Sequence, residues 1–357
     1  MGSVEVDGVV IGAGVVGLAC AAALAPGRVL LVLERHSRHG TETSARNSGV
    51  IHAGLYYPPG SRKARVCVEG RERLYAYAAR RGIPHRRTGK LVLAVDADEE
   101  EALQDLATRA RENGVRELTL LDAAELRARE PTLRAHAALH VGESGIVDAH
   151  ALMDALKADA RAAGATFVFG HEVVRIEPEG ERVRVVANGP DGEARLRARF
   201  VVNAAGHGAA ALAGRRSFPW VGRYFVLASN APKPETALVY PLPVTGGLGI
   251  HLTRDLGGQT LAGPDALPGS ALDVPASLAA AFASSVARFL PSLRPEHLAP
   301  GYAGIRPKLR ADGGFADFAV EERPSNTWHL LGIESPGLTA ALALADEVAG
   351  RVAERGL

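Results

Sequence analysis

Three glycines near the start of the chain, followed by an acidic residue, have the types and the spacing that bind a dinucleotide. Gly12, Gly14 and Gly17 form a G-x-G-x-x-G segment directly after an apolar stretch. The first permits a tight turn, the second lets backbone N–H groups approach a pyrophosphate, and the third lets a helix pack closely on a strand. Glu34 follows the apolar run 29–33, where its carboxylate can accept hydrogen bonds from a ribose diol. The flanking strands and the acid favour this interpretation over a glycine-rich turn without a nucleotide.

The elements around this segment alternate between strand and helix. The hydrophobic spacing predicts helices near 61–81, 97–112, 149–163 and 276–290, with Asp96 or Asp98 as the N-cap of the second. It predicts a pair of strands near 172–188, further strands at 89–95, 166–169, 198–206, 221–227, 236–242, 249–253, 259–263 and 327–333, and a closing helix to about 354. We therefore expect an α/β fold (α+β overall), with a Rossmann-like domain and an inserted antiparallel-sheet domain.

The order of these elements implies that both domains are discontinuous. A chain of 357 residues is too long for most single cores. We expect the nucleotide-binding domain to comprise residues 1–84, 143–216 and 301–357. The substrate domain would then comprise residues 85–142 and 217–300.

Composition excludes several functional classes. The net charge is +1, with basic and acidic residues interspersed, so nothing indicates nucleic acid or an anionic membrane as a partner. Two cysteines cannot form a disulfide framework or a zinc site, and the histidines lack metal-ligand spacing, so we expect no metal. The sequence contains no run of 18 apolar residues. We expect a cytoplasmic protein without a transmembrane segment, and peripheral membrane contact stays open.

Four segments together carry a resemblance to a known family. They are the glycine segment, S-A-R-N-S-G-V-I-H-A-G-L-Y-Y at 44–57, G-I-R-P-K at 304–308 and G-I-E-S-P-G-L-T at 332–339. The chain resembles the D-amino-acid-oxidase-like superfamily of flavoproteins, and within it the L-2-hydroxyglutarate dehydrogenase/oxidase branch. Many bacterial members carry an acid where this chain has Gly49, which leaves the substrate open. The resemblance implies FAD as the cofactor.

The resemblance also implies which residues hold FAD. Gly12, Gly14, Gly17 and Glu34 would bind its ADP half, with Arg35 beside the last of them. The remaining candidates would line the pyrophosphate, the isoalloxazine approach and the adenine, and they are Arg46, Asn47, Ser48, Val173, Ala205 and Gly206. A surface salt bridge is the alternative for Arg46, and ordinary sheet core is the alternative for Val173.

A second helix start, at Gly337, Leu338 and Thr339, follows a buried strand. A helix N-terminus offers unpaired N–H groups and a partial positive charge. Pointed at the flavin N1–C2=O edge, it would stabilise the negative charge of the reduced ring. The alternative is a plain helix entry.

Oxidation of a 2-hydroxy acid needs a group that orients the carboxylate and a base for the hydroxyl proton. Arg306 stands where the wider superfamily binds carboxylates, and a guanidinium suits that task. Lys308, on the same face of an extended segment, would assist with a second carboxylate or be solvated. We expect His251, on the strand 249–253, to be the base, His52 to lie near the flavin ring and Tyr240 to bind substrate. Structural roles in the core are the alternatives for these three.

Other interpretations stay open on the sequence alone. Cys67 could attach flavin covalently, although an apolar helical face favours packing. The same fold could oxidise C–N bonds as an amino-acid or amine oxidase. A nicotinamide-dependent dehydrogenase and a flavoprotein with purely structural FAD are the remaining candidates. The electron acceptor could be oxygen, a quinone or a protein.

Overall fold

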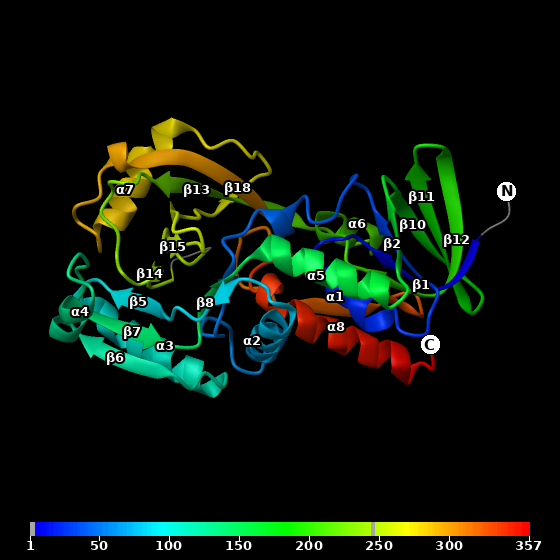
Figure 1. The fold of residues 1–357 in the computed structure, drawn as a ribbon, viewed down its shortest axis with the longest axis horizontal. Coiled ribbons are helices and arrows are strands. Elements are labelled where there is room, and N and C mark those ends of the chain that lie inside the picture. The colour runs from blue at the N-terminus through cyan, green and yellow to red at the C-terminus, as the bar shows by residue number, and fades with distance from the viewer. Residues whose placement is uncertain (1–3, 244–246) are drawn as a thin grey trace.

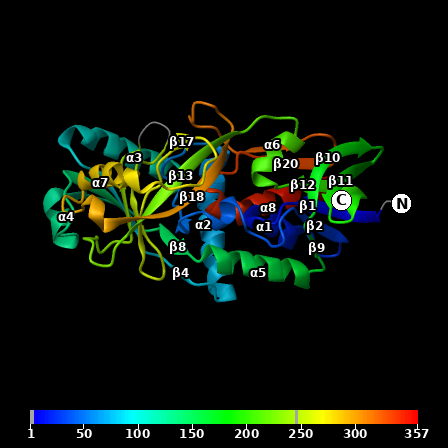
Figure 2. The same ribbon diagram turned by 90° about the horizontal axis from the view of Figure 1, so that it is seen from above.

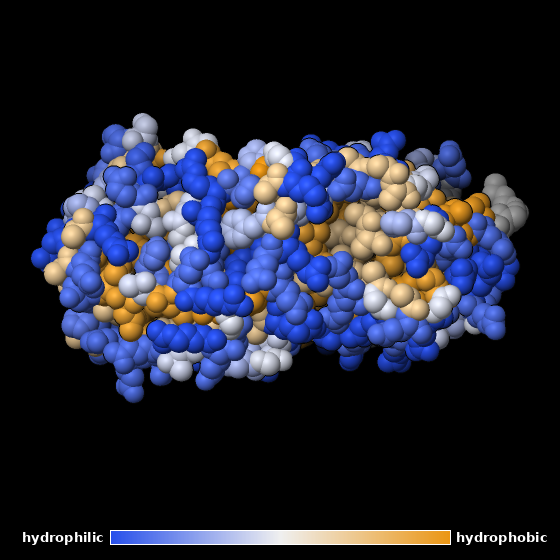
Figure 3. Space-filling view, turned by 60° about the horizontal axis from the view of Figure 1, so that its bottom comes forward, coloured by the Kyte–Doolittle hydropathy of each residue, from blue (hydrophilic) through white to orange (hydrophobic). Residues whose placement is uncertain are grey.

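The computed structural model describes residues 4–243 and 247–357. Two large sheets lie at opposite ends of its long axis, and helices cover the first of them (Figure 1). Most of the face seen in Figure 3 is hydrophilic, with apolar side chains visible between the charged ones. No helix in the described ranges is long and apolar enough to cross a membrane.

The first sheet contains eight strands within the described residues, and it is parallel at its centre. The parallel strands pair in the order β9-β2-β1-β12-β20, and β10, β11 and β19 add antiparallel edges. Their bounds are β1 Val4–Ile11, β2 Leu30–Glu34, β9 Thr166–Phe169, β10 Glu172–Glu179, β11 Arg182–Gly189, β12 Gly192–Asn203, β19 Ala319–Glu322 and β20 Thr327–Leu331.

Small residues let the helices of this half pack closely. Helix α1 (Val15–Leu24), rich in alanine, packs against α5 (Ala149–Ala162) and α8 (Gly337–Glu354), and α8 also contacts α2 (Arg62–Arg81). Figure 2 shows α1 and α8 side by side. Polar caps fix where two of these helices begin: Ser61 accepts from the third residue of α2, and Asp148 accepts from the first turn of α5.

The second sheet contains nine strands within the described residues, and all but one of its pairs are antiparallel. The exception is β14 beside β5, a parallel pair that joins the two separated pieces of this half. The strands are β5 Lys90–Ala94, β6 Leu118–Asp122, β7 Ala137–Val141, β13 Phe218–Leu227, β14 Leu238–Pro241, β15 Leu252–Arg254, β16 Thr260–Ala262, β17 Leu267–Pro268 and β18 Leu298–Lys308. Its helices are α3 Glu100–Glu112, α4 Ala123–Arg129 and α7 Ala279–Ala287.

A small sheet links the two halves. Strands β3 (Val50–Ile51), β8 (Gly145–Val147) and β4 (His85–Arg86) pair antiparallel, and α6 (Ala209–Leu212) follows β12. The segments before and after β3 therefore run from the first sheet toward the second.

The predicted fold class and most elements are confirmed, with local corrections. Neither Asp96 nor Asp98 caps a helix: a 3-10 turn occupies 97–99, and α3 begins after Glu99 without a side-chain cap. The strand predicted at 249–253 begins only at Leu252, because Gly249 adopts a positive φ of 72° that breaks the extended run. Strand β18 lies in the second sheet, so we propose a domain boundary near 308 rather than 300.

Candidate active site

A single cavity of about 1080 Å³ runs between the two halves of the molecule and is lined by residues of both. Small-ligand cavities usually measure roughly 300–1,000 Å³, so this one has room for a dinucleotide together with a small substrate. One end lies against the glycine segment and Glu34. The other end lies against Tyr240, His251 and Arg306.

At the first end, the glycines stand where a Cβ would collide with neighbouring protein atoms. A Cβ on Gly12, where φ is 96°, would lie 2.6 Å from the Ala204 carbonyl oxygen, and one on Gly14 would lie 3.0 Å from Ser44 Oγ. A Cβ on Gly17 would lie 2.0 Å from the Gly12 carbonyl oxygen, so this glycine permits helix packing and does not line the cavity. Gly14, the N-cap residue of α1, has no side chain, and Ser44 Oγ accepts a hydrogen bond from the first N–H of the helix, that of Val15, at 3.0 Å. This helix N-terminus, with Ser44 beside it, fits the pyrophosphate of FAD.

Glu34 lies at the same end and is 8% exposed. Its two carboxylate oxygens accept hydrogen bonds from the backbone N–H groups of Ala13 (2.7 Å) and His36 (2.9 Å). These bonds fix the carboxylate and leave lone pairs for the ribose hydroxyls. Arg35 also lines the cavity, where it is paired with Glu42 and Glu172.

The loop before β3 continues the cavity wall, and hydrogen bonds hold its shape. Asn47 donates to the Ser44 carbonyl at 2.6 Å and accepts from the backbone N–H of Gly49 at 2.8 Å. Arg46 donates to the Ala303 carbonyl on β18 at 3.3 Å, and within the described residues it has no ion-pair partner. The alternative role for Arg46, a surface salt bridge, therefore has no acidic partner among the described residues. Ser48 and Tyr224 of β13 both line the cavity.

Three further candidates for the cofactor lie along the same wall. Val173, Ala205 and Gly206 all line the cavity. Val173 also packs in the core of the first sheet, so its position fits both of the roles considered for it. Gly206 has a positive φ of 54°, as a tight turn after β12 requires.

The N-terminus of α8 reaches the middle of the cavity. Gly337 and Leu338 line it, and no side chain caps this helix. Thr339 lies behind the wall, where its hydroxyl donates to the Val50 carbonyl at 3.3 Å and accepts from the His52 N–H at 3.0 Å. Its side chain therefore connects α8 to β3 and does not face the cavity.

Arg306 enters the second end from β18 without a carboxylate partner among the described residues. It donates to the main-chain carbonyls of Asp265 (3.3 Å) and, at 3.5 Å, Val221. The Asp265 carboxylate is already bound by the Arg223 guanidinium at 2.6 and 2.8 Å. A Cβ on Gly222 would lie 2.6 Å from Arg306 Nη2, so this glycine makes room for the guanidinium. The positive charge is therefore free to bind an anion.

His251 and Tyr240 form a stack in the same wall. Their ring centres lie 3.7 Å apart with an interplanar angle of 16°. His251 Nδ1 lies 2.8 Å from the Gly249 carbonyl, which makes Nδ1 the donor and Nε2 the acceptor of the neutral ring. Burial lowers the pKa of His251 to about 3, and the nearby Lys90 and Arg306 charges contribute to this change. The ring is neutral near pH 7 and directs its acceptor nitrogen away from the backbone.

Lys90, which the sequence analysis did not single out, packs against the Tyr240 ring of this stack. Its side chain is fully buried, and Nζ lies 4.0 Å from the Tyr240 ring centre. Because His251 lies within 4 Å of the same centre, the amine and the imidazole occupy opposite faces of Tyr240. Burial lowers the pKa of Lys90 to about 7. The amine has no hydrogen-bond partner among the described residues.

His52 lies where the chain leaves β3. Its Nε2 is 3.1 Å from Ser335 Oγ, just before α8, and Nδ1 has no partner among the described residues. Burial lowers the pKa of His52 well below its usual value, and the nearby Lys90 charge adds to this effect. His52 therefore lies beside the helix start at which the flavin ring is expected.

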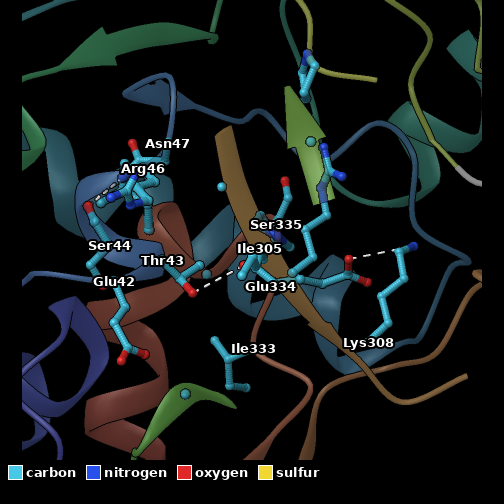
Figure 4. A pocket seen from close by; sticks show the side chains of 18 of the residues that line it. Glu42, Thr43, Ser44, Arg46, Asn47, Ile305, Lys308, Ile333, Glu334 and Ser335 are labelled. Atoms are coloured by element: carbon cyan, nitrogen blue, oxygen red, sulfur yellow. Dashed lines mark hydrogen bonds and ion pairs between the residues drawn. The ribbon is translucent and has the colours of Figure 1, made fainter. Parts of the chain in front are cut away.

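Lys308 is not solvated, which corrects one of the two expectations for it. It is 8% exposed, donates to the Gly313 carbonyl at 2.9 Å and lies 3.6 Å from Glu334 Oε2. Lys63, from α2, pairs with the other oxygen of Glu334 at 2.9 Å. Figure 4 shows Glu334 extending toward Lys308 beside Ser335.

Cys67 is fully buried on α2 and lies outside the cavity lining. Burial raises the pKa of its thiol to about 12, so the reactive thiolate is disfavoured at neutral pH. Both cysteines are free. This position fits the packing role.

Sequence reasoning missed several residues that the fold brings together at the second end. Those that line the cavity are Tyr56, Lys63, Tyr224, Asp265 and Glu334, and behind them Lys90 packs on Tyr240 and Tyr302 on Tyr224. A signal existed for the lysines, because this chain contains only five beside 36 arginines, and three of the five are buried. No spacing pattern marked the tyrosines, because they come from separate strands and loops.

Comparison with known proteins agrees with this geometry. The model of the family described as FAD dependent oxidoreductase (DAO) matches residues 7–351. A protein of Arabidopsis thaliana named mitochondrial L-2-hydroxyglutarate dehydrogenase is 38% identical over an alignment that covers 97% of this chain and 83% of that protein.

Solved structures share the fold over nearly the whole chain. L-alpha-glycerophosphate oxidase from Mycoplasma pneumoniae, solved with FAD bound, superposes with a TM-score of 0.89 at 25% identity, covering 98% of this chain and 95% of that one. Glycine oxidase from Geobacillus kaustophilus gives a TM-score of 0.83 at 23% identity, with 99% and 95% covered.

Proposed function

The chain belongs to the FAD dependent oxidoreductase family, and from this premise we propose that it oxidises an L-2-hydroxy acid to the 2-oxo acid. L-2-hydroxyglutarate is the prototype substrate, since that is the substrate named in the Arabidopsis relative. When bound, FAD supplies the acceptor for the hydride that leaves C2 of the substrate.

The observation that carries the proposal is the unpaired Arg306 beside a neutral, oriented histidine. Within the described residues the guanidinium is held only by the main-chain carbonyls of Asp265 and Val221, so it can bind the C1 carboxylate in a bidentate manner. Gly222 leaves the space in which that guanidinium lies. This contact would fix the substrate with its C2 carbon toward the cofactor.

His251 is our candidate for the base. Its Nδ1–H bond to the Gly249 carbonyl keeps Nε2 as the acceptor for the C2 hydroxyl proton. Stacking on Tyr240 holds the ring in place. We assign His52 to the cofactor side, because its imidazole is bonded to Ser335 at the start of α8.

The residues at the first end of the cavity would hold FAD. The α1 N-terminus with Gly12 and Gly14 fits the pyrophosphate, and Glu34 fits the ribose. The α8 N-terminus at Gly337 and Leu338 would face the ring and stabilise negative charge on it.

Oxidation of a C–N bond is the main alternative in this fold, as the name of glycine oxidase indicates for that protein. An amine can lose its proton without a strong protein base, whereas an alcohol needs an acceptor such as His251 Nε2. The oriented imidazole therefore favours the alcohol.

The compartment and the electron acceptor stay proposals. Two free, buried cysteines suit a cytoplasmic protein, whereas the Arabidopsis relative is named as mitochondrial. Oxygen, a quinone and a protein are the acceptors to compare.

The test is anaerobic mixing of the yellow holoenzyme with L-2-hydroxyglutarate, with its D enantiomer, glycine, sarcosine and glycerol 3-phosphate as comparators. We expect rapid loss of the oxidised flavin absorbance with the L-hydroxy acid alone. Bleaching by glycine or sarcosine instead would assign the enzyme to C–N oxidation.

A further inference from the structure

A cluster of two lysines and one glutamate lines the cavity close to Arg306. Glu334 bonds Lys63 through one oxygen at 2.9 Å and lies 3.6 Å from Lys308 through the other. All three side chains contribute to the cavity lining, and both lysines are less than one-tenth exposed. We propose that this cluster, named here the Lys63–Glu334–Lys308 cluster, binds the second carboxylate of a dicarboxylic substrate.

The charge balance of the cluster points to an anion. Two ammonium groups share one carboxylate, so one buried positive charge has no counter-charge within the cluster. Arg306 adds a second, since the nearby Asp265 carboxylate is bound by Arg223. Burying unpaired charge is costly. A ligand with two carboxylates would compensate both charges at once.

The aromatic rings around the Lys63 and Lys308 ammonium groups strengthen the need for a bound anion. Lys308 Nζ lies 5.3 Å from the centre of the Trp220 ring, and Lys63 Nζ lies 5.0 Å and 5.4 Å from the ring centres of Phe318 and Phe315. These aromatic walls reduce the water around the ammonium groups. Burial lowers the pKa of Lys308, and repulsion from Arg306 and Lys63 lowers it further, whereas Glu334 raises it. A bound carboxylate would relieve this repulsion.

The spacing on β18 fits a five-carbon chain. Arg306 and Lys308 are two residues apart on one strand, so their side chains leave the same face about 6.5 Å apart. The carboxyl carbons of an extended five-carbon dicarboxylate lie about 5 Å apart, given C–C bonds of about 1.5 Å. One carboxylate can therefore contact Arg306 while the other contacts Lys308.

This inference rests on the proposed function but can be tested apart from it. We would titrate the holoenzyme with glutarate and with pentanoate, which have the same chain length but two and one carboxylates, and follow the flavin difference spectrum. Neither compound carries a C2 hydroxyl, so the measurement needs no turnover. Wild type should bind glutarate at least about 10-fold more tightly, the scale of one charged hydrogen bond.

Three variants complete the experiment, with Lys233→Met, on the loop before β14, as the matched control. Lys308→Met should abolish most of the preference for glutarate over pentanoate, and Lys308→Arg should restore part of it. Retained flavin absorbance and an unchanged Tm show that a variant is folded. The preference ratio is also measured in Lys63→Met, so one misfolded variant does not decide the result.

The outcomes separate the carboxylate site at the cluster from the proposed oxidation of a 2-hydroxy acid. A wild-type enzyme without preference for glutarate, or a Lys308→Met variant that keeps the preference, overturns the cluster as a carboxylate site. Equal weakening of both ligands overturns it too, because the lysines would then act through the fold or the flavin. If glutarate is preferred but no 2-hydroxy acid reduces the flavin, the cluster stands and the proposed function fails.

Discussion

The two ends of the cavity are built in different ways. At the nucleotide end, backbone geometry forms most of the site: two glycines, a helix N-terminus and one carboxylate lie within the first 34 residues. At the substrate end, side chains from β5, β14, β18 and the segment before α8 converge. Local sequence can therefore specify the first end, whereas only the tertiary fold assembles the second.

The difference extends to charge. The substrate end buries Lys63, Lys90 and Lys308, and none of these has a carboxylate to itself in the part of the chain that the structure describes. At the nucleotide end, Arg35 is paired with Glu42 and Glu172. Uncompensated buried charge costs stability and is retained where it serves binding or chemistry. We therefore expect changes at the substrate end to alter activity more than cofactor content.

The largest effect is expected at His251. His251→Asn keeps a donor for the Gly249 carbonyl but removes the Nε2 acceptor, so flavin reduction should slow by about 10²- to 10⁴-fold with FAD still bound. His150→Asn, at the exposed start of α5, is the matched control. Anaerobic stopped-flow absorbance measures both, and an unchanged rate in His251→Asn would remove it as the base.

The pH profile sharpens this assignment. Because the pKa of His251 is lowered to about 3, the imidazole stays neutral and able to accept a proton as pH falls from 8 to 5. Protonation of His251 should therefore cause no loss of the wild-type reduction rate in that range. A rate that falls with an apparent pKa near 6.5, and does so only while His251 is present, would contradict a buried neutral base.

Lys90→Met should stabilise the protein. The native pKa of about 7 lies below the ordinary 10.5, so the unfolded chain binds this proton more readily than the native state. The cost of burying the amine is constant below pH 7 and shrinks as pH rises toward 10.5. At about 1.4 kcal/mol per pKa unit it amounts to about 4–5 kcal/mol at pH 7.

Urea unfolding of wild type, Lys90→Met and the control Lys157→Met at pH 7 and pH 9 measures that prediction. The gain from Lys90→Met should be larger at pH 7 than at pH 9. A loss of stability at both values would mean that the amine is stabilised by its contact with the Tyr240 ring.

Gly12→Ala tests the other end. The new Cβ would meet the Ala204 carbonyl oxygen, and the residue would keep a φ of 96°, so FAD affinity should fall by about 10- to 100-fold. Gly27→Ala also has a positive φ but meets nothing within 4 Å, so it isolates the backbone strain. Equal loss of FAD affinity in both variants would show that backbone strain, and not the collision with Ala204, causes the loss.

The smallest effect is expected for Gly222→Ala. Its Cβ would push the Arg306 guanidinium aside without changing any charge, so kcat/KM should fall by about 10-fold with FAD content unchanged. Gly350→Ala in α8 meets no neighbouring atom and is the control. Unchanged kinetics would imply that Arg306 does not need its present position.

The sequence predicted the parts of this molecule that depend on local pattern. The glycine segment, the small-residue helix after it and α2 follow from spacing alone. The position of His251 did not, because the positive φ of Gly249 ends the extended run before β15. From the sequence, Lys90 is only a polar residue near the start of the strand predicted at 89–95. Its contact with the Tyr240 ring depends on the pairing of β5 with β14, which the sequence does not show.

The central claim is that one cavity joins an FAD site to a 2-hydroxy acid site. It is tested most directly by anaerobic titration of the holoenzyme with L-2-hydroxyglutarate, with flavin absorbance and 2-oxoglutarate followed together. We predict one equivalent of 2-oxoglutarate for each flavin bleached. Flavin that stays oxidised with this acid while glycine or sarcosine bleaches it, or bleaching without 2-oxo acid, would contradict the account.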